Sequence, residues 1–234
     1  MTEFDIHRLF EKGYPGLEVA ATIGSVSDYQ KIVEEFLPLI RAQMTVRFLA
    51  RMKQDYPNLN EEELRERHEG HEWTVDGLLT GLLSGSVVVA AWAAFEQSVV
   101  AICRYMQEKE VVPLVLDDLR EQDLCRKLHK YLRVLTRQNF QLPHSLSDIQ
   151  ILRNLYTHHN GSIEHLSESR RNRINAIINS SSGVTLYDKY HVILSPDYLR
   201  ESTQKTDANL SALLSFVETR YPHDDRSQSS NQSS

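Results

Sequence analysis

One short segment of the chain combines an arginine and a histidine at a spacing that could handle a phosphate group. It reads Arg153-Asn154-Leu155-Tyr156-Thr157-His158 and lies in a stretch with helical periodicity that Asn160-Gly161 should end. Arginine presents a planar, permanently charged fork that suits phosphate. Histidine can donate and accept protons near neutral pH, and the last turn of a helix favours its protonated form. The pair could therefore bind a phosphodiester and transfer protons at it.

The spacing also limits this interpretation. Five positions on an ideal helix turn through about 140°, so Arg153 and His158 do not share one face. Either the long arginine reaches around the helix, or a second copy of the helix completes the site. On spacing alone, the ordinary interpretation of a solvated arginine and a histidine near a helix end is favoured.

The surrounding sequence predicts helices that would hold this segment in place. From Gly77 to Phe95 there is no charged residue, within an apolar helix expected over 74–108. Alternating apolar residues over 184–194 suggest a small hairpin. Residues 1–25 are expected to be loop, and Pro38 to kink or divide a helix that begins near Ser27 and ends before Pro57. Residues 58–72 predict a short charged helix with a turn at Gly70. Further helices are expected over 119–137, 147–159, 163–179 and 196–220, which makes the chain all-α.

The string Leu152 to Gly161 resembles the Arg-x(4–6)-His signature of the HEPN superfamily, in its common Arg-Asn-x-x-x-His form followed by Asn-Gly. The order of predicted elements over residues 74–220 is also similar. The resemblance implies an HEPN-like helical bundle (74–222), with an N-terminal helical extension (1–73) and a disordered tail (223–234). It also implies that Arg153 and His158 are catalytic. His159 is a competing candidate, and Asn154 and Glu96 would support the site.

What the resemblance implies for activity is an endoribonuclease that uses no metal or cofactor. The ribose 2′-hydroxyl would attack its adjacent phosphate, with His158 as general acid or base and Arg153 stabilising the phosphoryl oxygens. Such proteins usually form homodimers and act as toxins or antiviral-defence effectors, so an antitoxin or regulatory partner is expected. The alternative is a non-catalytic HEPN module that binds RNA, nucleotide or a protein partner.

Composition narrows where RNA could bind. The 234-residue chain has a formal net charge of −6, so a nucleic-acid site has to be a local basic patch. Its two cysteines lack a metal-binding or redox spacing, which fits a reducing cytoplasm. His68 and His71 have no evident third ligand, so no metal site is predicted. The candidate RNA-binding residues form two groups: Arg126, Lys130 and Arg133, and Arg170, Arg171 and Arg173.

The uncharged stretch from Gly77 to Phe95 leaves a membrane span as a third interpretation, because it is nearly long enough to cross a bilayer. Gly77, Gly81 and Gly85 have the small-residue spacing found in packed membrane helices. However, Asp76 and Glu96 flank the stretch directly and no basic residue lies near its start. A buried helix of a protein without a membrane span is therefore the prediction, with the glycines admitting a close neighbour.

Overall fold

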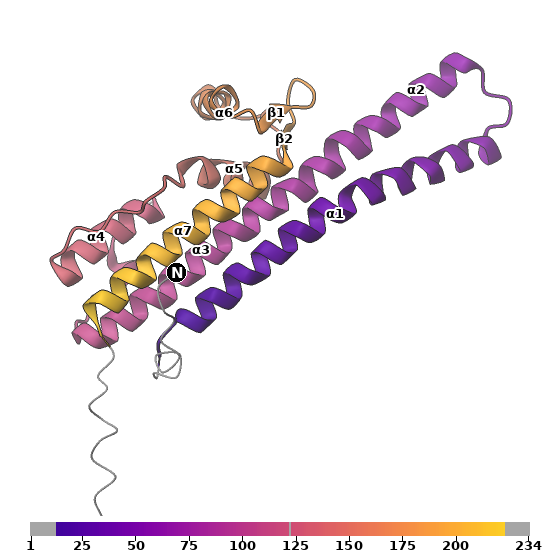
Figure 1. Cartoon of the computed structure of the whole chain (residues 1–234). Helices are drawn as coiled ribbons and strands as arrows, with labels where there is room; N and C mark the ends of the chain where they lie inside the picture. Colours follow the sequence, from indigo (N-terminus) through magenta and orange to yellow (C-terminus); the bar gives the residue numbers. More distant parts are fainter. Residues whose placement is uncertain (1–12, 122, 223–234) are drawn as a thin grey trace, which may run out of the picture. The chain divides into compact units, whose positions relative to one another are not determined.

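The computed structural model describes residues 13–121 and 123–222, and these residues confirm the predicted all-α class. The small sheet β1–β2 is the exception to the helices (Figure 1). In chain order the elements are α1 (Gly16–Asp55), α2 (Glu61–Glu72), a π-helical segment (Trp73–Leu79), α3 (Thr80–Glu110), a 3-10 turn (Leu116–Asp118), α4 (Leu124–Thr136), α5 (Ser147–His159), α6 (Glu168–Ser180), β1 (Val184–Leu186), β2 (Val192–Leu194) and α7 (Pro196–Arg220).

The chain divides into two compact units. Unit 1 takes its described residues from 1–23, 94–145 and 206–234, and unit 2 consists of residues 24–93 and 146–205. Because α1, α3 and α7 each cross a boundary, each contributes a segment to both units. The predicted catalytic segment on α5 lies in unit 2.

Unit 1 is built around α4. Asp123 caps this helix by accepting a hydrogen bond from the Arg126 backbone N–H at 2.8 Å, which is why α4 begins at Leu124 rather than at the predicted residue 119. The buried Tyr131 donates to backbone carbonyl oxygens of Cys103 and Leu114, at 3.2 and 3.3 Å. Other fully buried side chains of this unit include Phe95, Ile102, Met106, Leu128, Leu132, Leu210 and Leu213.

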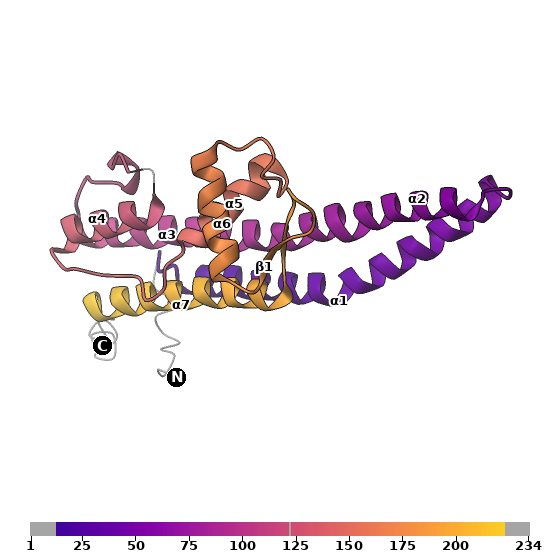
Figure 2. The ribbon, with the colours of Figure 1, turned by 90° about the horizontal axis from the view of Figure 1, so that it is seen from above.

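Unit 2 contains a long antiparallel pair of helices, formed by α1 with α2 and the start of α3 (Figure 2). The Tyr29 and Ser86 hydroxyls lie 2.6 Å apart across this pair, and Arg41 Nε donates to Asp76 Oδ1 at 2.7 Å. These contacts join residues 57 and 35 positions apart in the sequence and fix how the two helices align.

The course of α1 corrects the predicted loop at its start and excludes a division of the helix at Pro38. Residues 16–25, expected to be loop, are the first turns of α1, and the Pro15 carbonyl accepts from the Val19 N–H at 2.9 Å. A proline is tolerated there because the first N–H groups of a helix have no partner within it. Pro38 does not divide the helix, which continues to Asp55; its ring is exposed, so the bond it cannot donate lies on the solvent side. Ser27, near which the helix is predicted to begin, lies inside α1.

The apolar helix is longer than expected. Gly70 is not a turn, because α2 continues through the π-helical segment into α3 without a break, and the helical residues run from Glu61 to Glu110. By length and composition alone this stretch could cross a membrane. Half of its most apolar window is buried inside the protein, and the core helix of a soluble protein meets the same criterion.

Two glycines of the apolar stretch lie directly against aromatic rings of neighbouring segments. A Cβ added at Gly77 would lie 2.7 Å from ring atoms of Tyr187, and one added at Gly85 would lie 2.1 Å from a ring atom of Tyr156. Contacts this short cannot occur with a side chain present. The close neighbours are thus α5 at Gly85 and the loop between β1 and β2 at Gly77.

The predicted hairpin over 184–194 is confirmed. The strands β1 and β2 pair antiparallel, with Val184 opposite Leu194 and Leu186 opposite Val192. In both views the hairpin lies beside α6 (Figures 1 and 2). That helix begins at Glu168 rather than at the predicted residue 163, since residues 161–163 pair with the hairpin instead.

Candidate active site

Helix α5 carries the predicted catalytic segment and is positioned by its apolar face. Ile149, Leu152, Leu155 and Tyr156 are buried, at the spacing that places side chains on one side of a helix. The start of α5 agrees with the prediction, although Ser147 does not cap it: the N-cap residue is Leu146, without a side-chain hydrogen bond. The helix is therefore held by packing rather than by its first turn.

The predicted stop after α5 is confirmed in its backbone. Asn160 and Gly161 have φ angles of 50° and 80°, both in the left-handed region that favours these residue types. The Gly161 N–H donates to the Leu155 carbonyl at 3.4 Å, and the Asn160 N–H to the Tyr156 carbonyl at 3.2 Å. The chain consequently turns away from the helix directly after the two histidines.

Tyr156 is the residue that anchors α5, a role that the sequence did not reveal. Its ring is buried between Gly85 and Gly161, and its hydroxyl donates to the Val192 backbone carbonyl at 2.8 Å. Burial raises the pKa of Tyr156, so the hydroxyl keeps its proton and its hydrogen bond at neutral pH. Because Tyr156 lies between Arg153 and His158 in the sequence, it fixes the backbone from which both side chains extend.

The predicted site residues take different positions on α5. Arg153 is half-buried, and its Nη1 donates to Asn154 Oδ1 at 2.9 Å, so these two residues are brought together. His158 is exposed and forms no hydrogen bond or ion pair within residues 13–121 and 123–222. His159 is half-buried, and its carbonyl accepts from the Ser162 N–H at 2.8 Å. His158 is thus the histidine whose ring is open to solvent.

Glu96 lies on α3 and is half-buried. It belongs to unit 1, whereas α5 belongs to unit 2. Its predicted role of orienting Arg153 or His158 therefore stays a prediction.

The two basic groups lie on the helices predicted to carry them. On α4, in unit 1, Arg126, Lys130 and Arg133 are all exposed, and Lys130 Nζ is 3.2 Å from Glu121. They recur at helical spacing opposite the buried face of α4, so their charges could track a phosphate backbone.

The basic group on α6 differs from the one on α4, because one of its arginines forms a hydrogen bond within the protein. Arg170 and Arg173 are exposed, but Arg171 is half-buried and its Nη2 donates to the Glu164 carbonyl at 2.9 Å. Its Nε is buried without a hydrogen-bond partner among the described residues. Arg170 and Arg173 therefore remain the better candidates for contacts with RNA.

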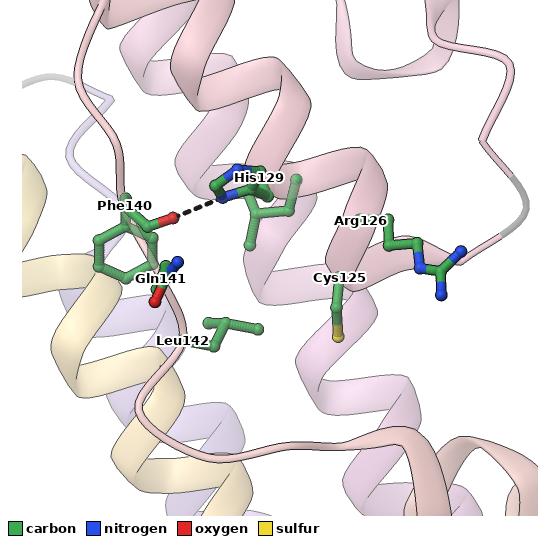
Figure 3. A pocket seen from close by; sticks show the side chains of 7 residues that line it. Cys125, Arg126, His129, Phe140, Gln141 and Leu142 are labelled. Carbon is green, nitrogen blue, oxygen red and sulfur yellow. Dashed lines mark hydrogen bonds between the residues drawn. The ribbon is translucent and has the colours of Figure 1, made fainter.

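An apolar pocket of about 270 Å³ lies beside α4 (Figure 3). His129 Nδ1 is 2.8 Å from the Phe140 carbonyl oxygen, so that nitrogen carries the proton and donates. Cys125 also lines the pocket; burial and the Asp123 carboxylate raise its pKa to about 12, which makes its thiol a poor nucleophile. Of the residues that line this pocket, only Arg126 is one of the predicted site residues.

No group of three or more metal-binding side chains is assembled among residues 13–121 and 123–222. His71 instead stacks on Phe48, with ring centroids 4.2 Å apart and planes within 4° of parallel. His68 pairs with Glu72 at 3.4 Å. These two histidines take part in the packing of α1 against α2.

Unit 2 holds one further group of polar side chains that the sequence interpretation missed. Asp188, in the loop between β1 and β2, contacts both His191 and Trp73. The signal that could have revealed it is an aspartate three residues before a histidine in a tight turn, where aspartate accepts backbone N–H groups.

Comparisons with known proteins found no match for this chain. No family model matches the chain, and neither a curated protein nor a solved structure matches it.

Proposed function

We propose that this protein is an HEPN-like endoribonuclease that cleaves RNA without a metal ion. The observation that carries the proposal is the second half of α5, where a half-buried Arg153 and an exposed His158 extend from a helix that Tyr156 anchors and Asn160-Gly161 terminates. This is the residue pattern of the HEPN signature on a helix of the expected length, within an all-α protein.

The proposed reaction is an internal transesterification. The ribose 2′-oxygen forms a bond to the adjacent phosphorus while the bond from phosphorus to the 5′-oxygen breaks. The products are a 2′,3′-cyclic phosphate and a free 5′-hydroxyl. Arg153 binds the phosphoryl oxygens as negative charge develops on them, and His158 transfers a proton. DNA lacks the attacking hydroxyl and should resist cleavage.

The test uses purified protein and single-stranded RNA in the presence of EDTA. Cleavage should persist in the chelator and yield cyclic phosphate ends. Arg153→Ala and His158→Ala should each reduce the rate at least about 100-fold, the usual contribution of a positioned proton-transfer group. His165→Ala is the matched control, because His165 is exposed and lies outside the signature. Loss of cleavage in EDTA, or full activity of both variants, would refute the proposal.

We further propose that the active form is a homodimer. Arg153 and His158 lie about 140° apart on their helix, and a second α5 could supply the missing partner. Apolar side chains on the outer face of α1 support self-association, since Ile32, Leu39 and Val46 are 52, 60 and 66% exposed. Mixing Arg153→Ala with His158→Ala should restore part of the activity, because a mixed dimer retains one intact copy of each residue. No recovery would show that each chain acts alone.

The biological role follows from the resemblance alone. A toxin or antiviral-defence effector of the cytoplasm, restrained by an antitoxin or regulatory partner, is the role we propose. Expression of the wild-type protein should arrest growth of the host cells, while Arg153→Ala should be tolerated.

A second candidate function is a non-catalytic HEPN module that binds RNA, nucleotide or a protein partner. The observation that favours it is the same angular separation of Arg153 and His158 on a regular helix. Binding of RNA without any cleavage product, in dimeric protein, would select this alternative.

A further inference from the structure

The loop between β1 and β2 holds a carboxylate in an unusually complete set of hydrogen bonds. Asp188 Oδ1 accepts from the backbone N–H groups of Tyr190 and His191, at 2.6 and 2.7 Å. Asp188 Oδ2 lies 2.8 Å from His191 Nδ1 and accepts from Trp73 Nε1 at 3.1 Å. Burial opposes the charge, yet these hydrogen bonds hold the pKa of Asp188 well below its usual range. The carboxylate is therefore ionised and fixed in place.

This carboxylate determines the state of the His191 ring. With Nδ1 facing an anionic oxygen, the proton of a neutral ring resides on Nδ1, and Nε2 keeps its lone pair. Nε2 forms no hydrogen bond with the described residues, and the side chain is 20% exposed. Trp73 packs edge-on against the ring, with centroids 5.8 Å apart. A histidine oriented by a carboxylate, with its second nitrogen free, is arranged to accept a proton.

The hairpin places this histidine next to the end of α5. His191 and Ser162 form an isolated antiparallel bridge, and the Val192 N–H donates to the Gly161 carbonyl at 3.0 Å. Side chains opposite one another in such a pair lie on the same face, about 5 Å apart at Cβ. The Ser162 N–H in turn donates to the His159 carbonyl at 2.8 Å. Three consecutive backbone contacts thus connect the Asp188–His191 pair to the segment that carries His158.

RNA transesterification needs two proton transfers, and the signature supplies one histidine in each chain. The 2′-hydroxyl must lose a proton as it attacks, and the departing 5′-oxygen must gain one. A single group can do both only by moving between them, whereas two groups on either side of the phosphate act together. His158 lies in the last turn of α5 with its ring open to solvent, where it can reach a departing oxygen and donate to it.

We propose that His191 is the general base of this site, positioned by Asp188, and that His158 is the general acid. The inference rests on the proposed ribonuclease function and assigns a further catalytic residue to it. His191 Nε2 takes the proton of the 2′-hydroxyl as the bond from oxygen to phosphorus forms. His158 gives a proton to the 5′-oxygen as its bond to phosphorus breaks. Exchange of protons with water restores both rings.

The discriminating experiment compares two substrates of the same sequence. One is an ordinary RNA dinucleotide, and in the other the departing 5′-oxygen is replaced by sulfur, which leaves without protonation. On ordinary RNA, His158→Ala and His191→Gln should each lower kcat about 100-fold or more. On the sulfur substrate, His158→Ala should recover and His191→Gln should not, because only the acid has become unnecessary.

Asp188 is tested as a positioning residue by a readout that does not depend on cleavage. Nitrogen-15 NMR of wild-type protein should show the His191 ring protonated at Nδ1 and bare at Nε2. Asp188→Asn should abolish this preference and lower kcat about 10- to 100-fold. Lys189→Ala, an exposed change in the same loop, should leave both the ring and the rate unchanged. Urea unfolding of each variant separates these effects from loss of structure.

The possible outcomes separate the two proposals. If His158→Ala is inactive and His191→Gln retains activity within about threefold, the base assignment is wrong and the ribonuclease function stands. Recovery of His191→Gln on the sulfur substrate also overturns the assignment, because it marks His191 as the acid. If the wild-type protein cleaves neither substrate, the ribonuclease proposal fails and the base assignment fails with it, whatever the NMR shows.

Discussion

Replacing Gly85 with alanine should destabilise unit 2, because the new methyl group would occupy the space of the Tyr156 ring. An added Cβ would lie 2.1 to 2.4 Å from three ring atoms, and such a contact requires the ring to move. The Tyr156 ring cannot move toward Gly161 on its other side. A Cβ added at Gly161 would lie only 2.8 Å from the ring, so there is no free space on that side. The clash therefore has to be relieved by shifting α5 away from α3.

The size of the effect follows from three contributions. Overpacking a buried position costs up to about 3 kcal/mol. Displacing Tyr156 also breaks its hydrogen bond to the Val192 carbonyl, which adds roughly 1 kcal/mol or more. The higher helix propensity of alanine opposes this loss and stabilises the folded protein by about 1 kcal/mol. The free energy of unfolding should thus fall by about 3 kcal/mol, which lowers Tm by roughly 6 to 12 °C in a chain of this length.

Urea unfolding monitored by circular dichroism measures this change, with Gly24→Ala as the matched control. Gly24 is also helical and belongs to unit 2, but it is exposed and no atom lies within 4 Å of an added Cβ. That variant should be as stable as the wild type or more stable by up to about 1 kcal/mol. Equal stability of the two variants would contradict the packing described here, because the Tyr156 ring would then have to lie elsewhere.

Three further predictions concern single side chains. Tyr156→Phe keeps the ring but leaves a buried carbonyl without its donor, so the unfolding free energy should fall by about 1 to 2 kcal/mol in urea titrations. Asp188→Asn should destabilise the protein at pH 7. Because the folded pKa of Asp188 is depressed, its charge stabilises the protein above the usual aspartate pKa range. This contribution declines as the pH falls below about 4 and is lost only below the depressed pKa, so the loss of unfolding free energy caused by Asp188→Asn should be smaller at pH 3 than at pH 7. Burial raises the pKa of Cys103, and burial together with the Asp123 charge raises that of Cys125 to about 12. A thiol reagent at pH 8 should therefore label Cys103 only as fast as the protein unfolds, and should label the partly exposed Cys125 more slowly than a free cysteine. Rapid labelling of Cys103 in native protein would contradict its burial.

Features set by neighbouring residues could be predicted from the sequence. The end of α5 at Asn160-Gly161 depends on two residue types that tolerate the left-handed region, and the start of α7 follows Ser195-Pro196. Alternating apolar residues and a polar loop are also local signals, and they predict the hairpin that β1 and β2 form.

Features that depend on contacts between distant segments could not be predicted in this way. The Trp73 indole and the Asp188 carboxylate are 115 residues apart, and nothing in either local sequence indicates that they meet. Glycine is a poor helix former and predicts a turn at Gly70, yet the helix continues through it, with His68 and His71 on either side contacting Phe48 of α1. Tertiary contacts outweigh local preference in both cases.

The two tryptophans of the chain occupy opposite environments, since Trp73 is 41% exposed beside the hairpin loop and Trp92 is 2% exposed. Iodide in solution should quench the fluorescence of the first and leave that of the second, which emits at shorter wavelength. A ligand that settles against the His191 ring would shield Trp73 or alter its emission. Binding of a ligand next to His191 can therefore be monitored by intrinsic tryptophan fluorescence. The measurement needs no label and does not depend on product formation.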